Sequence, residues 1–355
     1  MQKTSTQHGR HPPSTAARWL LLLAGTVFSS VSAAIPYIPN LGTAGAFNAF
    51  ILENMHGYYS DVEGRLAVGG NLSLEHYSVG LLKNNSAGSR DDLIVGGDAS
   101  FQHGRVYSGN AAIAGKNNIH HENVGFYAGD DPSNSSGSAR VDSVLDFAAI
   151  GAELRDKSAK WGAWDSTGTT SVTTWGEVRF TGSGHGSVFN VNAQYLNSAS
   201  SIWFDMPSYT TAVINVFGSE VELSNFGFFH TALPSGSAQM PDNRPREFRH
   251  DGSLTNRILF NFVDATDISV HGIGFKGSLL APLADVSFYN GHIDGNFISR
   301  SVTAPEGLAS GQFNDYAFNA FNQVPAPSTL ASFALGLLIL SSGGLRRSRS
   351  RLSVQ

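Results

Sequence analysis

LAVGGNLSL at residues 66–74 returns as LIVGGDASF at residues 93–101, an offset of 27 residues, and a shorter copy, YSGNAAI, follows at 107–113. Each unit contains a three-residue apolar strand, a glycine turn with Asn or Asp, and a short alternating strand. Such a unit has an apolar face that it cannot cover alone. We therefore expect the units to stack as coils of a solenoid, with about 4.8 Å between coils. Two similar hairpins in a β-sandwich are the alternative.

The same pattern returns late in the chain. Apolar or alternating strands occupy 257–263, 269–271, 277–282, 285–289 and 293–298, separated by turns that contain Gly, Asn or Asp. Strands of three to five residues between such turns are typical of coils rather than of long hairpins. We predict a mainly β fold, a right-handed parallel β-helix or solenoid-like domain with one flanking α-helix.

One segment has helical spacing. Apolar or small residues recur at steps of three and four through 141–161, with Asp142 or Ser143 available as a cap. The sequence predicts a helix of about five turns there, lying along the sheets. A shorter helix is expected around Phe47, Phe50 and Ile51. Residues 130–139 and 241–251 are expected to be exposed polar loops.

The composition narrows the class of protein. Charged residues are 14% of the chain, against about 25% in an average soluble protein, and there are 39 Gly but only six Lys. This is untypical of a helix-rich cytosolic enzyme. The chain has no Cys, which excludes disulfides, thiolate metal sites and cysteine nucleophiles.

The charge is uneven. Residues 1–34 and 324–355 together hold seven basic residues and no acidic residue. The segment between them holds the other 16 of the 23 basic residues and all 28 acidic residues, so its net charge is −12. Nucleic-acid binding depends on basic side chains that neutralise phosphates. We therefore expect no nucleic-acid partner.

The N-terminus has the order of a secretory signal peptide. Basic residues up to Arg18 precede an apolar run, and the small-residue stretch 29–34 follows it. We expect residues 1–34 to be removed, with cleavage after Ala33 or Ala34. An uncleaved anchor is the alternative.

The C-terminus has a second apolar run. Residues 329–345 are 17 uncharged residues, a length of about 25 Å as a helix against a hydrocarbon core of about 30 Å. A basic tail, 346–355, follows. A marginal transmembrane segment is expected here, with its arginines in the cytoplasm.

A polar motif precedes this run. The motif is VPAPST at 324–329, and the basic cluster comes after the apolar span. This three-part arrangement resembles the PEP-CTERM sorting signals of Gram-negative bacteria, with Ala326 where that family usually has Glu. The residues that carry the resemblance are Val324, Pro325, Ala326, Pro327, Arg346, Arg347, Arg349 and Arg351. It implies transient residence in the inner membrane, processing by an exosortase-type enzyme, and transfer to the envelope or extracellular polymer. An ordinary single-pass anchor is the alternative.

The region 35–305 carries a resemblance of its own. SDVEGR at 60–65 leads into the first repeat, and LLAP at 279–282 precedes GHIDGNFI at 291–298. Together they resemble the choice-of-anchor A domain, a bacterial surface module. The resemblance implies export, surface display and, for some members, adhesion to matrix or polymer; it supplies no catalytic residues. Residues 306–328 are then expected to be a linker that ends in the sorting motif.

Candidate metal ligands are sparse. His120, His121 and Glu122 are adjacent, but neighbouring side chains on a strand point to opposite faces. Asp91 with Asp92, and the pair at 130–131, are expected to be turns, with a Ca²⁺ site as the alternative. We expect no other cofactor.

Two functional hypotheses remain. An enzyme that cleaves polysaccharide would use paired carboxylates, and Asp264, Asp267, Asp285 and Asp294 are the candidates. No complete catalytic motif supports this alternative, so we expect no catalytic residues.

The favoured hypothesis is a structural or adhesive protein of the cell surface or extracellular matrix of a Gram-negative bacterium. Exposed aromatic rings can bind sugar rings on a solenoid face, and the candidates are Tyr58, Tyr59, Trp161, Trp164, Trp175, Trp203 and Tyr289. The expected ligand is a polysaccharide or matrix polymer. A regular Thr ladder, as in ice-binding solenoids, is not evident.

Overall fold

A computed structural model describes residues 39–233, 238–242 and 249–320, all within the unit Ile35–Gln355. The expected signal-peptide cleavage site and the sorting motif with its apolar span lie outside these residues. Within the described part, no helix combines the length and apolar character needed to cross a bilayer. The predictions about the two ends therefore stay predictions.

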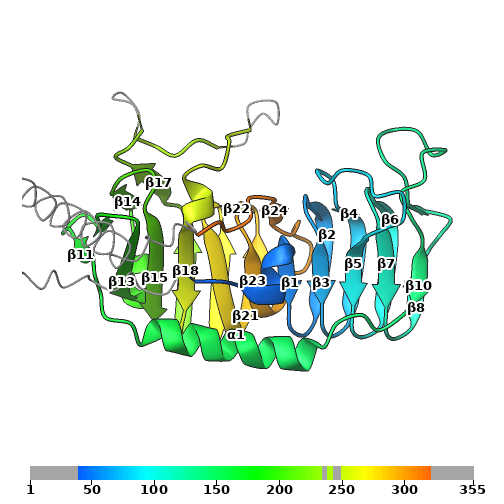
Figure 1. The fold of residues 1–355 in the computed structure, drawn as a ribbon, viewed down its shortest axis with the longest axis horizontal. Helices are drawn as coiled ribbons and strands as arrows, with labels where there is room; N and C mark the ends of the chain where they lie inside the picture. The colour runs from blue at the N-terminus through cyan, green and yellow to red at the C-terminus, as the bar shows by residue number, and fades with distance from the viewer. Residues whose placement is uncertain (1–38, 234–237, 243–248, 321–355) are drawn as a thin grey trace, which may run out of the picture. The chain divides into compact units, whose positions relative to one another are not determined.

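Short strands lie side by side in parallel through most of the described chain (Figure 1). One row, which we call face A, has ten parallel strands. In spatial order they are β10 (Ala139–Val141), β7 (Asn110–Ile113), β5 (Asp91–Val95), β3 (Leu66–Val68), β1 (Ala49–Ile51), β23 (Phe297–Thr303), β21 (Ser278–Tyr289), β18 (Ile258–Phe262), β15 (Thr211–Phe217) and β13 (Gly186–Asn192). The predicted mainly β, parallel solenoid is confirmed.

Two further faces complete the coils. Face B contains β16 (Glu220–Ser224), β19 (Asp267–His271), the second halves of β21 and β23, the first halves of β2 (Met55–Val62), β4 (Leu72–Val79) and β6 (Ala99–Val106), and β8 (Asn117–Ile119). Face C contains β11 (Thr169–Val172), β12 (Glu177–Thr181), β14 (Ser201–Asp205), β17 (Gly227–His230), β20 (Gly274–Lys276), β22 (His292–Asp294), β24 (Gln312–Asn314), the second halves of β2, β4 and β6, and β9 (Val124–Gly125). Between these strands only β11 pairs in the antiparallel sense.

The coils do not follow one another in sequence order. From β1 in the middle of face A, successive coils lead to β10 at one end (Figure 1). Helix α1 (Phe147–Gly162) then runs along the strands, and the coils that begin at β13 return to the middle. There β23 pairs with β1, so the first and last coils are neighbours. We call this junction the seam.

Residues at equivalent positions of the 27-residue sequence repeat pair with each other on neighbouring strands. Leu66 pairs with Leu93 between β3 and β5, and Leu72 pairs with Ala99 between β4 and β6. The shorter third copy is β7, where Ala111 lies opposite Leu93. The solenoid alternative is therefore confirmed over the hairpin alternative.

Phenylalanine fills the interior, as expected from its high count. Phe180, Phe204, Phe260 and Phe297 are among the fully buried side chains inside the coils. A second apolar layer lies outside face A, where Trp161 of α1 joins a buried cluster that covers the strands. The flanking helix thus buries the outer surface of face A.

A ladder of amides also holds α1 to face A. Asn190, Asn215 and Asn261 are in register on β13, β15 and β18. Asn215 Nδ2 donates to Asn190 Oδ1 at 3.0 Å and to the carbonyl of Trp161 at 2.8 Å. Asn261 Nδ2 donates to Asn215 Oδ1 at 2.9 Å. Buried polar groups need such partners, and the ladder supplies them.

Two helix predictions need correction. Helix α1 begins at Phe147, later than predicted, because Asp146 is the cap and accepts a hydrogen bond from the Ala149 N–H at 2.9 Å. The predicted helix near Phe50 is a 3₁₀ turn, η1 (Gly42–Ala46), followed by β1. Pairing with β3 and β23 on both sides of β1 overrides the local helical spacing.

The domain also continues beyond the expected boundary at 305. Residues 312–314 form β24, and Phe313 and Tyr316 are buried. The expected linker at 306–328 is therefore part of the domain up to residue 320, the last residue described. Within the loop expected at 241–251, the described residues Arg249 and His250 are only partly exposed, because they pack against the domain.

Candidate functional site

A shallow groove runs along face B. It consists of two hollows of about 480 Å³ each, and both are lined by Asp285, Ser301 and Thr303. Because the hollows share these residues, they adjoin at β21 and β23, and we call the two together the groove. The groove extends from β16 across β19, β21 and β23 to β2 and β4.

Small hydroxyl side chains form one row on this face. Register places Ser269, Ser287 and Thr303 side by side on β19, β21 and β23. Beyond one intervening coil, Ser73 lies beside Ser100 on β4 and β6. Neighbouring strands are about 4.8 Å apart, so the row offers hydroxyl groups at a near-regular interval.

A second row is acidic. Glu220, Asp267 and Asp285 are in register on β16, β19 and β21. Asp285 accepts a hydrogen bond from Ser301 Oγ at 2.6 Å and also binds Arg300. Two of the four carboxylates that the sequence suggested for an enzyme are thus brought together in the groove.

The other two candidate carboxylates lie elsewhere. Asp264 accepts a hydrogen bond from the backbone N–H of Gly218 at 2.8 Å, in the connection between strands. Asp294 is buried on face C and lies 2.7 Å from Lys276 Nζ. The structure therefore does not assemble the four carboxylates into one centre.

The candidate aromatic residues are spread over several faces. Tyr289 stacks on His271 with ring centroids 4.9 Å apart, at the end of the β21 and β19 segments that line the groove. Trp203 stacks on Phe229 at 4.6 Å on face C. Trp175 is 86% exposed in the turn between β11 and β12. Of the candidates, Tyr289 on β21 and Tyr58 and Tyr59 on β2 belong to strands that line the groove.

A ladder of rings follows the corner between faces B and C. Tyr59, His76 and His103 stack with centroids 4.3 and 4.8 Å apart, and Tyr58 packs edge-on against Tyr59. The three stacked residues have φ angles of 47° to 50°. Positive φ is uncommon outside glycine, so this corner has the same strained bend in three successive coils.

Several side chains considered for a metal site have other partners. Arg140 Nη2 donates to Asp91 at 2.9 Å, and Arg90 Nη2 donates to Asp92 at 3.0 Å. His120 Nδ1 lies 3.1 Å from Glu122. Across residues 39–233, 238–242 and 249–320, no three His, Asp or Glu side chains are grouped so that they could hold a metal ion. The Ca²⁺ alternative stays a prediction.

Face C carries a largely buried group of charged side chains, of which sequence reasoning found only Asp294. Lys276 lies on β20, and His292 and Asp294 lie on β22. Asp242 and His250 reach them from the segment that precedes η3 (Thr255–Arg257). We call these five residues the face C cluster. Lys276 and Asp294 are 18 residues apart in the sequence. The same spacing separates paired residues of β19 and β21, so an 18-residue repeat in the sequence could have indicated that Lys276 and Asp294 are neighbours.

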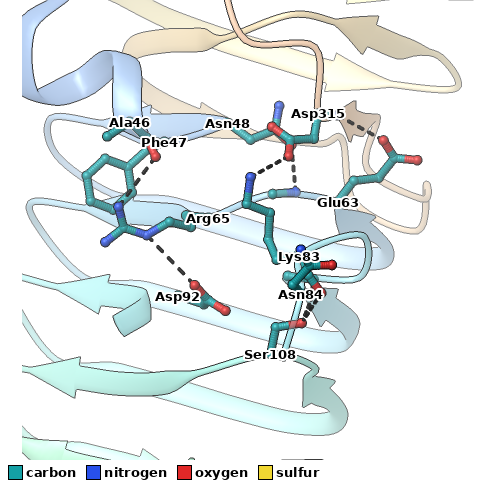
Figure 2. Close-up of polar contacts among 12 residues, drawn as sticks. Ala46, Phe47, Asn48, Glu63, Arg65, Lys83, Asn84, Asp92, Ser108 and Asp315 are labelled. Atoms are coloured by element: carbon teal, nitrogen blue, oxygen red, sulfur yellow. Dashed lines mark hydrogen bonds and ion pairs between the residues drawn. The ribbon is translucent and has the colours of Figure 1, made fainter. Parts of the chain in front are cut away.

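The SDVEGR stretch builds the seam. Glu63 accepts a hydrogen bond from the backbone N–H of Asp315 at 2.8 Å, and Lys83 Nζ lies 2.8 Å from the Asp315 carboxylate. Figure 2 shows Arg65 between the Phe47 ring and Asp92 on the next coil; its guanidinium carbon lies 4.2 Å from the ring centroid. These contacts make the motif structural.

A family model described as "Putative Ice-binding-like adhesive domain" matches residues 40–314. The chain belongs to this family. Membership in the ice-binding-like adhesive family gives the protein a surface adhesive or structural role and an extracellular or surface location. The finer resemblances to choice-of-anchor A and PEP-CTERM proteins stay predictions.

One solved structure similar to this ice-binding-like adhesive domain is an ice-binding protein from the Antarctic ascomycete Antarctomyces psychrotrophicus. The two share 10% sequence identity with a TM-score of 0.36, and the match covers 78% of this chain and 98% of the fungal chain. No curated protein matches the sequence.

Proposed function

We propose that this domain is an adhesin that binds a hydroxyl-rich polymer, a polysaccharide of the extracellular matrix, along the groove on face B. The two adjoining hollows of the groove carry the proposal, because an extended polymer needs a long, shallow surface. The row of Ser and Thr hydroxyls can exchange hydrogen bonds with sugar hydroxyls. Each contact is weak, and repetition along the coils adds them together.

The charge of the groove supports a neutral polymer over an anionic one. The groove is lined by Glu53, Glu220, Glu222, Asp267 and Asp285, and Arg300 is the one Lys or Arg among the residues that line either hollow. An anionic polysaccharide would meet like charge there, which disfavours binding. The polymer is therefore proposed to be a neutral one.

The test compares two tryptophan substitutions. Ser287→Trp fills the groove, whereas Thr181→Trp places the same side chain at an exposed position on face C, outside the groove. Retention on immobilised neutral polysaccharide, and on the extracellular polymer of the source bacterium, should fall about tenfold for Ser287→Trp, a change of about 1.4 kcal/mol. It should be unchanged for Thr181→Trp. Equal retention of both variants, or no retention of the unmodified protein above a blank matrix, would refute the proposal.

Two other outcomes would identify a different activity. Release of reducing ends from the polymer, lost in Asp267→Asn, would favour the polysaccharide-cleaving alternative, because Asp267 and Asp285 are neighbours on adjacent strands. Ice is the second ligand to assay, since the family is ice-binding-like. Inhibition of ice growth that is lost in Ser287→Trp, without polymer retention, would replace polysaccharide by ice.

Export and sorting complete the proposal. We propose that the signal peptide is removed after Ala33 or Ala34 and that an exosortase-type enzyme removes the C-terminal tail near VPAP at 324–327, leaving the domain in the envelope or matrix of a Gram-negative cell. The resemblance of the motif, span and arginine cluster supports this step. Mass spectrometry of surface-exposed protein tests it: a mature form that still contains 335–340 would contradict sorting.

A further inference from the structure

Lys276 and Asp294 form a fully enclosed pair within the face C cluster. They are in register on the parallel strands β20 and β22, and Lys276 Nζ lies 2.7 Å from Asp294 Oδ2. The side chains are 4% and 0% exposed. A buried ion pair carries a large desolvation penalty, which its own attraction offsets only when the geometry is favourable.

Two donors act on the Asp294 carboxylate. Asn314 Nδ2, on β24, donates to Oδ1 at 2.6 Å, and His250 Nε2 lies 2.9 Å from Oδ2. His250 Nδ1 accepts a hydrogen bond from the backbone N–H of Gly252 at 3.1 Å, which leaves a proton on Nε2. His250 is therefore oriented to donate to Oδ2, while Asn314 polarises the opposite oxygen.

One carboxylate faces the Lys276 ammonium group. Nζ lies 3.2 Å from Asp242 Oδ1, and His292 Nε2 lies 2.6 Å from the same oxygen, a distance at which Nε2 donates to it. Asp242, held in place by His292, can accept a proton released by Lys276. The amine of Lys276 and the carboxyl group of Asp294 thus have a proton acceptor, a proton donor and a hydrogen-bond donor for the developing oxyanion around them.

We propose that Lys276 and Asp294 condense to an intramolecular amide bond that links β20 to β22. Nζ gives up a proton to the Asp242–His292 pair and attacks Asp294 Cγ, forming the N–C bond. The negative charge on Oδ1 is stabilised by Asn314. The bond from Cγ to Oδ2 breaks as His250 protonates Oδ2 and the second Nζ proton passes to the same oxygen, which departs as water. The proton that Asp242 accepted then returns to His250, so both protons lost by Nζ are accounted for in the water. An ammonium and a carboxylate contain the atoms of an amide plus water, so the step requires no oxidant and no co-reactant.

Burial favours the product. Burial alone would raise the pKa of Asp294, but hydrogen bonding from His250 and the charge of Lys276 lower this pKa to about 2. Before reaction the pair therefore consists of two enclosed charges. Condensation replaces them with a neutral amide and removes their desolvation penalty. The register of β20 and β22 also holds the two groups in contact, which gives the high effective concentration of an intramolecular reaction.

The bond would give a cysteine-free domain a covalent link. An adhesive protein bears load between a surface and a polymer, and a bond between neighbouring coils resists their separation. The inference does not depend on the identity of the polymer, so it can fail or hold independently of the proposed function.

Trypsin gives a direct test on the full chain. Between Arg257 and Arg300 the sole cleavage site is Lys276, so the unlinked protein yields two peptides, 258–276 and 277–300. An amide at Lys276 blocks cleavage there. The expected product is one peptide, 258–300, lighter than its sequence mass by one water. Two peptides of full mass from folded protein would overturn the proposal.

Two variants control the result. Lys276→Arg keeps a positive charge and a trypsin site but has no primary amine, so it should yield both peptides at full mass. His292→Gln should remain folded and accumulate the linked peptide more slowly after purification, because Asp242, the proton acceptor, loses the imidazole that holds it beside Lys276 Nζ. A 258–300 peptide that lacks one water in Lys276→Arg would show that the mass loss lies elsewhere and would refute the assignment.

Discussion

Ser158 on α1 and Asn261 on β18 hold each other by two hydrogen bonds across a buried boundary. Ser158 Oγ donates to Asn261 Oδ1 at 2.6 Å, and Asn261 Nδ2 donates to the Ser158 carbonyl at 2.9 Å. The segment between them includes the last turn of α1 and the coils that contain β13 and β15. This pair therefore ties the C-terminal part of the helix to face A.

Replacing Asn261 with Ala should destabilise the domain by about 3 kcal/mol, because the Ser158 hydroxyl and the Asn215 amide would lose partners inside the protein. Asn190, at the half-buried end of the ladder, is the matched control, and Asn190→Ala should cost about 1 kcal/mol. Urea unfolding with an unchanged m-value measures both. Equal losses for the two variants would contradict the larger contribution of Asn261.

Gly96 lies where two coils approach closely. A Cβ there would lie 2.4 Å from the carbonyl oxygen of Gly69 on the neighbouring coil, which cannot move without separating the strands. Gly96→Ala should therefore cost about 1 to 3 kcal/mol. Gly186, whose Cβ would lie 4.0 Å from the nearest atom, is the control, and Gly186→Ala should change little. Melting temperatures distinguish the two, and a tolerated Gly96→Ala would show that the coils can separate.

His230 makes stability depend on pH. Burial lowers its pKa to about 4 from an ordinary value of 6.5. The unfolded chain therefore binds a proton at a higher pH than the folded chain does, so stability falls as pH drops from about 6.5 to about 4, by about 3 kcal/mol. His230→Asn keeps an acceptor for the Ala232 N–H but cannot titrate. Its stability should fall less across that window, and parallel profiles for the two proteins would contradict the prediction.

The Glu63–Arg249 pair stabilises the seam. Glu63 is 4% exposed and binds Arg249, whose guanidinium also lies 4.0 Å from the Tyr316 ring centroid. Arg249→Met should cost about 3 to 5 kcal/mol, because it leaves a buried carboxylate without its cation. Adding Glu63→Gln should recover part of that loss. A double-mutant cycle measures the coupling, and additive losses would show that the pair is not coupled.

The amount of structure that the sequence predicts differs from element to element. The offset between Leu66 and Leu93 predicts their register, because each glycine-containing unit occupies one coil. The return of the chain along α1 has no such signal: nothing local indicates that β1 and β23 pair across about 250 residues of sequence. Likewise Asp267 and Asp285 were chosen as single acidic residues, and only strand pairing shows that they are neighbours.

The sequence indicated Asp294 but not the other four residues of the face C cluster, for the same reason. Lys276 and Asp294 are separated by one 18-residue coil, whereas the repeat recognised in the sequence had 27 residues. A repeat whose length changes along the chain escapes a search at one offset. His250 belongs to an irregular segment, where side-chain direction has no period to predict it.

The seam has a consequence for the order of folding. The strand that β23 needs as its neighbour, β1, is made at the other end of the polypeptide, and Asn48 Nδ2 bonds the carbonyl of Gly295 across 247 residues. Contacts of such long range slow folding, since a large loop must close before they form. A chain that cannot complete its sheet until its last coils emerge stays unfolded for longer after synthesis, the state in which a polypeptide can be threaded through a narrow membrane pore.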